Sequence, residues 1–190
     1  MIVAIDGPAG AGKSTVARAV AGALSFTYLD SGAMYRCVGL RPDADPATLD
    51  ISFDGERVLL DGEDVSAAIR TPEAARAASV AATDPAVRSA LVAKQRDLLA
   101  NGDWVVEGRD IGTVVAPDAE LKIWLTADPV ERARRREITV AELRERDERD
   151  ATRDVSPMRA AADAVELDTT GQSVEEIVAN IVKLVAAVRT

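Results

Sequence analysis

The chain has 190 residues, 47% of them hydrophobic, and a formal net charge of −9. This length favours a single globular domain that buries a substantial core. The acidic balance argues against a protein whose main task is to grip a nucleic-acid backbone. The single cysteine, Cys37, excludes an internal disulfide, and the absence of histidine removes the commonest general base.

The N-terminal residues form a short apolar run without the basic region and long apolar core of a secretory signal. No apolar run in the sequence approaches the length that spans a bilayer. We therefore expect a cytoplasmic protein with no membrane anchor and no nucleic-acid polymer as partner. Nothing in the sequence calls for an assembly larger than a monomer.

A glycine-rich segment follows the apolar run at residues 2–5 and carries the strongest chemical signal. A G-x-x-x-x-G-K-[ST] loop between a strand and a helix binds the phosphates of a nucleoside triphosphate through its backbone N–H groups. Lys13 would reach the β- and γ-phosphates, and Ser14 would ligate Mg²⁺. The alternative is a glycine turn that merely joins strand to helix. The predicted ATP-binding residues are Gly7, Pro8, Ala9, Gly10, Ala11, Gly12, Lys13, Ser14 and Thr15.

A helix is expected over residues 13–24, because Val16, Val20 and Leu24 repeat at helical spacing. A strand at residues 26–29 and a helix at about 33–40 come next. Residues 49–65 then change character, with period-two alternation and turn signals at Asp54-Gly55 and Asp61-Gly62. We interpret this stretch as a small antiparallel insertion at about residues 41–70 of a single domain, residues 1–190.

Four helix starts and three strands are indicated in the second half of the chain. The helix starts are capping residues followed by proline, or a capping box: Thr71-Pro72, Asp84-Pro85, Asp128-Pro129 and Ser173-x-x-Glu176. Short apolar runs typical of buried parallel strands occupy 104–107 and 121–125, with a weaker run at 164–167. Strands alternating with helices predict an α/β fold, a parallel five-stranded sheet with helices on both faces.

Ligands of such folds bind beyond the carboxyl ends of the strands. Gly7, Asp30 and the turn at residues 108–110 all follow predicted strands and should therefore converge. The densely charged stretch at 131–154 follows the fourth strand. It is interpreted either as a solvated helical face or as a short arginine-bearing lid, at about residues 132–145, that closes over phosphates.

The residue types indicate what happens to the γ-phosphate. Phosphoryl transfer needs in-line positioning and cations, and an acceptor that is already an ionised phosphate needs no base. Many arginines with no histidine fit that case, although Asp30 could serve as a base in a sugar or alcohol kinase. A carboxylate for Mg²⁺ is hard to nominate, because the apolar strands end at Glu107 and near Asp128. The metal would then be held mainly by Ser14, ATP oxygens and water.

Two further motifs are more specific than the glycine-rich loop. They are Asp30-Ser31-Gly32-Ala33-Met34-Tyr35-Arg36 and Gly108-Arg109-Asp110-Ile111-Gly112-Thr113-Val114-Val115. Together with segments at 5–15, 62–65, 69–79, 87–88, 117–119 and 145–150, they resemble the bacterial cytidylate kinases, a branch of the nucleoside monophosphate kinases. The matching segments are in order and spread over nearly the whole chain.

The resemblance implies a P-loop kinase that transfers phosphate from ATP, with Mg²⁺, to CMP or dCMP. It implies that the acceptor phosphate is held by arginines, that cytosine is read by a serine, an arginine and an aspartate, and that the ribose is held by a serine and an aspartate. The arginines that match the phosphate-holding positions are Arg36, Arg109 and Arg153. The residues that match the cytosine-reading positions are Ser79, Arg88 and Asp110. The residues that match the ribose-holding positions are Ser31 and Asp150. With Lys13, the three phosphate-holding arginines are the candidate catalytic residues.

Alternatives stay open at several of these positions. Ser79 could be an ordinary serine on a helix surface, and Asp150 one member of a run of surface ion pairs. The insertion and the lid are both shorter than is usual for the family, so Arg132, Arg135 and Arg136 are all candidates for the lid contact with the transferring phosphate. Other readings are a P-loop kinase for AMP, dTMP, dephospho-coenzyme A or shikimate, or a regulatory ATP-binding module.

Overall fold

A computed structural model describes residues 1–153 and 155–189. Contacts between residues divide the chain into two compact units: Met1–Asp30 with Leu99–Thr190, and Ser31–Leu98. The first unit is therefore built from two separate stretches of sequence. The second unit is continuous and longer than the insertion expected at about residues 41–70.

The first unit is built on a five-stranded sheet in which every pairing is parallel, with strand order β2-β6-β1-β7-β8. The strands are β1 (Ile2–Asp6), β2 (Thr27–Asp30), β6 (Trp104–Glu107), β7 (Leu121–Thr126) and β8 (Val165–Asp168). Consecutive residues of β1 from Val3 to Asp6 are all buried, so both faces of this central strand are shielded from water. The predicted parallel five-stranded sheet is confirmed.

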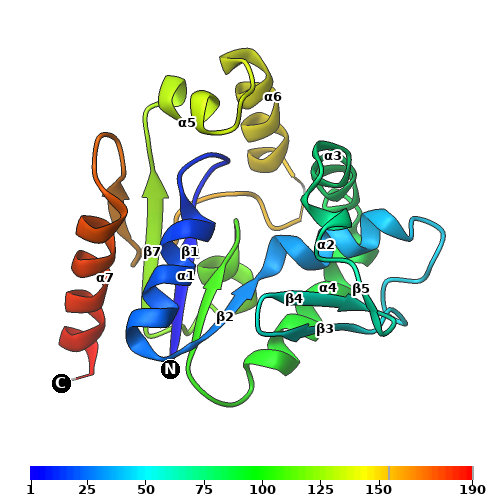
Figure 1. The fold of residues 1–190 in the computed structure, drawn as a ribbon, viewed down its shortest axis with the longest axis horizontal. Coiled ribbons are helices and arrows are strands. Elements are labelled where there is room, and N and C mark those ends of the chain that lie inside the picture. The colour runs from blue at the N-terminus through cyan, green and yellow to red at the C-terminus, as the bar shows by residue number, and fades with distance from the viewer. Residues whose placement is uncertain (154, 190) are drawn as a thin grey trace. The chain divides into compact units, whose positions relative to one another are not determined.

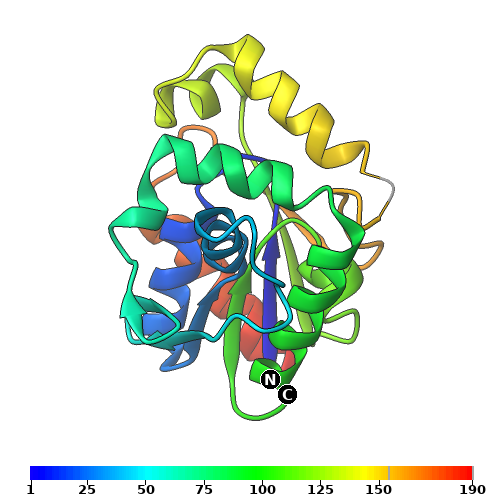
Figure 2. The same cartoon turned by 90° about the vertical axis from the view of Figure 1, so that its right-hand side faces the viewer.

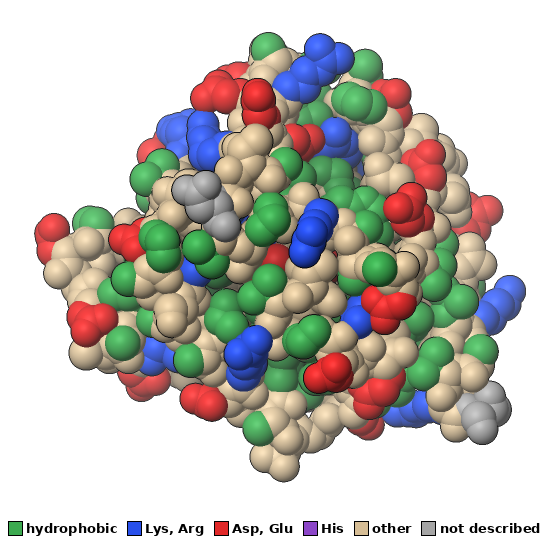
Figure 3. Space-filling view, turned by 180° about the vertical axis from the view of Figure 1, so that it is seen from behind, with side chains coloured by type: hydrophobic (Ala, Val, Ile, Leu, Met, Phe, Trp, Pro, Cys, Tyr) green, Lys and Arg blue, Asp and Glu red, His purple; other side chains and the backbone are tan. Residues whose placement is uncertain are grey.

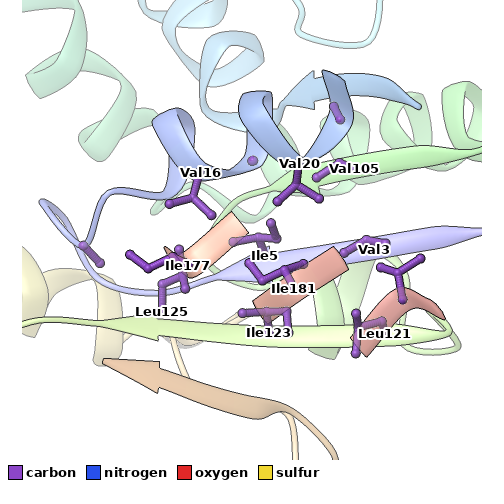
Figure 4. Close-up of a cluster of buried hydrophobic side chains, with 14 residues drawn as sticks. Val3, Ile5, Val16, Val20, Val105, Leu121, Ile123, Leu125, Ile177 and Ile181 are labelled. Carbon is purple, nitrogen blue, oxygen red and sulfur yellow. The ribbon is translucent and has the colours of Figure 1, made fainter. Parts of the chain in front are cut away.

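Helices α1 (Lys13–Leu24) and α7 (Val174–Val188) pack against each other over one face of this sheet. Figure 4 shows Val16 and Val20 of α1 and Ile177 and Ile181 of α7 facing the side chains of the central strands. Burial of these branched side chains removes a large apolar area from water, at roughly 25 cal/mol per Å². The predicted capping box at Ser173 is present at the start of α7.

Two helices, α5 (Pro129–Arg135) and α6 (Val140–Ala151), lie beyond the carboxyl ends of β1 and β7 (Figures 1 and 2). The Asp128 side chain caps α5 as predicted, by accepting hydrogen bonds from two backbone N–H groups. A capping box of Thr139 and Glu142 begins α6, a helix start that was not predicted. Leu143 and Ala133 are buried with Ala9 of the glycine-rich loop, which fixes both helices against that loop.

The second unit holds α2 (Ser31–Leu40), α3 (Pro72–Ala81), most of α4 (Pro85–Leu99) and a three-stranded antiparallel sheet. That sheet contains β3 (Ile51–Asp54), β4 (Arg57–Leu60) and β5 (Glu63–Asp64), and a short 3-10 helix follows at Ala68–Arg70. The predicted antiparallel hairpin is confirmed. Helices α2 and α3 approach closely, because a Cβ added at Gly39 would lie 2.8 Å from the Cβ of Ala77.

Among the described residues, no helix is long and apolar enough to cross a membrane. On the face drawn in Figure 3, acidic side chains are interspersed with Lys and Arg.

Candidate active site

The glycine-rich loop, residues 7–15 and called the P-loop below, connects the central strand β1 to α1. Gly10 adopts φ 78°, and a Cβ at this position would lie 2.6 Å from the carbonyl oxygen of Arg132. A side chain is therefore excluded both by backbone conformation and by the neighbouring helix. Gly12 of the loop is the N-cap residue of α1, so the positive end of that helix faces the loop.

Lys13 is buried at the centre of the P-loop region, with 6% of its surface exposed. Its ammonium group donates a hydrogen bond of 2.8 Å to the carbonyl oxygen of Pro8. Burial lowers the pKa of Lys13, and the positive charge of Arg109 lowers it further. A phosphate anion bound in the loop would relieve both effects, so Lys13 is placed to bind one.

Glu107 ends β6 beside Asp30 at the end of β2, as the strand register requires. Its carboxylate accepts hydrogen bonds from the Tyr28 hydroxyl, at 2.6 Å, and from the Ser14 side chain. Burial raises the pKa of Glu107, and the negative charge of Asp30 raises it further, whereas Lys13 opposes the rise.

This arrangement fits a bound Mg²⁺ ion. Ser14 Oγ is the ligand expected from the P-loop, and Glu107 lies beside it. The charges of Glu107 and Asp30 repel each other until a cation is present. The described residues contain no group of three or more His, Cys, Asp or Glu side chains that could hold a metal by themselves. Phosphate oxygens and water would therefore complete the coordination.

Asp6, the last residue of β1, holds the turn that follows β6. Its carboxylate accepts hydrogen bonds from the backbone N–H groups of Ile111 (2.9 Å) and Gly112 (2.7 Å). These residues belong to a π-helical turn, Ile111–Val115, which starts directly after Arg109 and Asp110. Asp6 thus orients the segment that carries two of the predicted site residues.

Burial is the main cause that raises the pKa of Asp6 to about 6, and the nearby charge of Asp110 adds to it. The folded-state pKa lies above the unfolded value, so the folded chain holds more protons than the unfolded chain between about pH 4 and pH 6. Asp6 therefore contributes stability at low pH that is lost as the pH rises through this window. We expect Asp6→Asn to remove that loss, which amounts to about 3 kcal/mol.

Urea denaturation at several pH values, for both proteins, measures this effect. The free energy of unfolding of the unsubstituted protein minus that of Asp6→Asn should fall between pH 4 and pH 7. A difference that stays constant over this range would show that Asp6 titrates as an ordinary exposed carboxyl.

Three predicted site residues of the first unit form one cluster. Arg109 Nε lies 3.2 Å from Asp150 Oδ2, and Arg153 pairs with the other carboxylate oxygen of Asp150. The Asp150 side chain is 3% exposed, so it is not one of a run of solvated surface ion pairs. Arg109 also acts electrostatically on Lys13, which places the cluster beside the P-loop.

The three lid candidates occupy different environments. Arg132 donates to the carbonyl oxygen of Ala9 at 3.1 Å, and Arg135 donates to that of Gly10 at 3.4 Å, so both guanidinium groups contact the P-loop backbone. Arg136 is exposed, and its positive charge helps to lower the pKa of Lys13. Of the three, Arg136 has the placement that best suits a lid contact with phosphate.

The second unit carries the remaining predicted site residues. Ser31 is buried at the start of α2, and Ser79 is buried in α3, so the reading of Ser79 as a surface serine was wrong. Arg88 is 2% exposed, with its guanidinium carbon 5.5 Å from the centre of the Tyr35 ring and Nη1 3.3 Å from the carbonyl oxygen of Ala82. Arg36 lies on α2, one residue after Tyr35.

Asp6, Thr169 and Asp147 were not singled out from the sequence. Asp6 directly precedes the P-loop, and its position at the end of an apolar strand was an available signal. Asp147 and Thr169 act through the tertiary structure, because their partners in the P-loop are more than 130 residues away. The spacing of residues along the chain does not indicate such contacts.

Solved structures with a similar fold include a shikimate kinase from Acinetobacter baumannii and the protein TT1252 from Thermus thermophilus. The first is 15% identical with a TM-score of 0.56 and covers 98% of this chain and 93% of its own. The second is 19% identical with a TM-score of 0.56 and covers 100% and 98%. A P-loop after the central strand of a parallel sheet places this fold in the P-loop class of α/β proteins.

The family model described as cytidylate kinase matches residues 3–187. The cytidylate kinase of Carboxydothermus hydrogenoformans is 44% identical, with 97% of each chain covered. That of Pelotomaculum thermopropionicum is 47% identical, with 98% of this chain and 96% of the relative covered. The chain belongs to the cytidylate kinase family. The alignment with the first relative has 215 positions, more than the residues of this chain, so the relative contains segments that are trimmed here.

Proposed function

We infer that the protein transfers the γ-phosphoryl group of ATP to CMP or dCMP and releases ADP with CDP or dCDP. Membership of the cytidylate kinase family supports the acceptor. One arrangement carries the reaction type: Arg109, which lies 3.2 Å from Asp150 in the acceptor cluster, also acts through its charge on the P-loop residue Lys13. A cation assigned to the acceptor phosphate therefore lies beside the cation assigned to the donor phosphates.

In the proposed reaction, an oxygen of the CMP phosphate forms a bond to the γ-phosphorus. The bond from that phosphorus to the β,γ-bridging oxygen breaks, and its electron pair remains on ADP. The acceptor oxygen is already ionised, so no general base is needed. The residues orient the two phosphates and offset their repulsion.

The proposed roles divide between the two phosphates. Lys13 and the P-loop N–H groups hold the donor, while Arg36, Arg109 and Arg153 hold the acceptor through guanidinium forks that suit phosphate. Arg136 would contact the migrating group from the lid. A bound Mg²⁺ ion, held by Ser14 and ATP oxygens, would neutralise charge on the β- and γ-phosphates.

The proposed reading of cytosine uses Ser79, Arg88 and Asp110. A carboxylate accepts a hydrogen bond from the exocyclic N4 amino group of cytosine, whereas uracil presents the O4 acceptor there. Arginine and serine donate to O2 and N3. Ser31 and Asp150 are assigned to the ribose or its neighbouring groups. Ser79 and Arg88 are buried in the second unit, and Asp110 is buried in the first.

Asp110→Asn is expected to lower the preference for CMP over UMP by about 10-fold or more, because an amide can also donate to O4. The measurement is kcat/KM for the two nucleotides, with thermal unfolding to confirm that the variant folds. Asp118→Asn, at an exposed aspartate of the same unit, controls for the lost charge. An unchanged ratio of CMP to UMP would remove Asp110 from base selection.

The function itself is tested by ADP formation with CMP, dCMP, UMP, AMP, dTMP, dephospho-coenzyme A and shikimate under identical conditions. CMP and dCMP should give the highest kcat/KM. Turnover mainly with another acceptor would assign the protein to a sister kinase. ATP hydrolysis without any acceptor would instead favour a regulatory ATP-binding module. We propose that the enzyme acts as a cytoplasmic monomer in pyrimidine nucleotide metabolism.

A further inference from the structure

An ion pair between Arg132 of α5 and Asp147 of α6 forms hydrogen bonds with one residue of the P-loop, Ala9. Arg132 Nη1 lies 2.6 Å from Asp147 Oδ2 and 3.1 Å from the carbonyl oxygen of Ala9. Asp147 Oδ1 lies 3.4 Å from the backbone nitrogen of Ala9 and accepts its N–H. Arg132 Nε also donates to the carbonyl oxygen of Ala127, at 3.1 Å. The pair therefore holds both backbone polar groups of Ala9.

The two following carbonyl groups of the P-loop are also held by side chains. Arg135 donates to Gly10, and the Thr169 hydroxyl lies 3.2 Å from the carbonyl oxygen of Ala11. In a trans peptide the C=O and the next N–H point in opposite directions, and the described residues contain no cis peptide. Fixing the carbonyls of Ala9 and Ala11 turns the N–H groups of Gly10 and Gly12 to the other side of the loop, where phosphate would bind. The Ala11 N–H instead donates to the carbonyl oxygen of Pro8, at 3.4 Å.

Helix α6 connects the Arg132–Asp147 ion pair to the cluster of Arg109, Asp150 and Arg153, which is assigned to the acceptor phosphate. Asp147 and Asp150 are three residues apart, so they project from neighbouring positions on the same helix. Asp147 contacts Ala9 and Arg132, whereas Asp150 pairs with Arg109 and Arg153. A change at Ala9 would move Asp147 and, through the rigid helix, Asp150.

We propose that Arg132 and Asp147 are positioning residues that couple ATP binding in the P-loop to CMP binding at the Arg109–Asp150–Arg153 cluster. The inference rests on the proposed function, because it takes CMP as the acceptor. The binding of ATP orders the loop, the ion pair transmits that order to α6, and Asp150 then holds the arginines in place for the acceptor phosphate. By thermodynamic reciprocity, CMP tightens ATP binding by the same factor.

The test measures the dissociation constant of CMP by calorimetry, without and with saturating β,γ-methylene ATP and Mg²⁺. We expect the analogue to tighten CMP binding by about 5-fold or more in the unsubstituted protein. Asp147→Asn keeps the shape of the side chain and an oxygen for the Ala9 N–H but removes the charge that pairs with Arg132. It should reduce the coupling factor to below about 2, with the binding of CMP alone nearly unchanged.

Arg132→Lys gives a second variant that keeps the positive charge but loses the fork that reaches several acceptors, and it should also reduce the factor. Glu148→Gln, an exposed carboxylate next to Asp147 on α6, should leave the factor unchanged. A merely structural role would weaken each ligand equally and keep the factor.

A coupling factor of one in the unsubstituted protein, or the same factor in Asp147→Asn, would overturn the proposal. If CMP is phosphorylated and the factor is insensitive to Asp147, only the coupling inference fails. Absence of both CMP binding and CMP turnover would overturn the proposed function together with it.

Discussion

Replacement of Arg109 by alanine is expected to lower kcat for CMP phosphorylation by on the order of 10³-fold or more, in analogy with arginines that stabilise phosphoryl transfer. Arg109 interacts with residues of both proposed phosphate sites: it pairs with Asp150 at 3.2 Å, and it acts on Lys13 of the P-loop through its charge. Without it the acceptor phosphate loses a bidentate partner, and repulsion between the two nucleotides is offset less fully.

The affinity for β,γ-methylene ATP should change by no more than about threefold, because the P-loop N–H groups and Lys13 remain. Arg109→Lys keeps the charge and should recover only part of the rate, since an ammonium cannot form the guanidinium fork. Arg134→Ala, at an exposed arginine of α5, controls for the loss of one positive charge. A normal kcat in Arg109→Ala would show that this side chain does not serve the reaction.

Lys13→Met should be comparably severe, with kcat reduced by about 10³-fold, because the ammonium group compensates charge on the transferring phosphate. In the protein without nucleotide, burial and Arg109 lower the pKa of Lys13. A lysine is charged below its pKa, so kcat/KM for ATP should fall as the pH rises through this lowered value. Bound phosphates favour the charged form, and kcat should therefore persist to higher pH.

Lys13→Arg separates charge from proton loss. Arginine stays protonated at all accessible pH values, so the variant should be slower but should lack the alkaline fall of kcat/KM. The measurement is the pH profile of kcat/KM for ATP in both proteins, at a CMP concentration well below its KM, so that most of the enzyme is free of nucleotide. An alkaline limb that is identical in Lys13→Arg would assign it to another group.

The sequence predicted those parts of the fold that depend on local signals. The P-loop motif, the cap-and-proline pairs and the capping box at Ser173 each act within a few residues, and the structure has a helix at each of them. Period-two alternation located the antiparallel hairpin, and short apolar runs located the strands of the parallel sheet. Strand ends varied by a residue because edge residues pair or fray independently of the pattern.

The contacts that organise the site were beyond local reasoning. Asp6 binds the N–H groups of residues 105 and 106 positions away, and Arg132 binds Ala9 across 123 positions. The order of the strands in the sheet decides which residues become such partners. The spacing of residues along the chain does not reveal that order. The roles of Ser79 and Arg88 came from family resemblance, since an isolated serine or arginine in a helix carries no chemical signal.

The position of β1 in the sheet has a consequence for synthesis on the ribosome. Its partners are strands that begin at Trp104 and Leu121, so the first strand made is completed only after most of the chain exists. At roughly 5–20 residues per second, on the order of ten seconds pass before β6 emerges. The continuous stretch Ser31–Leu98, which forms the second unit, is synthesised before then. The phosphate cradle is therefore a late product of translation, and a nascent chain halted before Trp104 exposes an apolar strand with no neighbour, a target for chaperones.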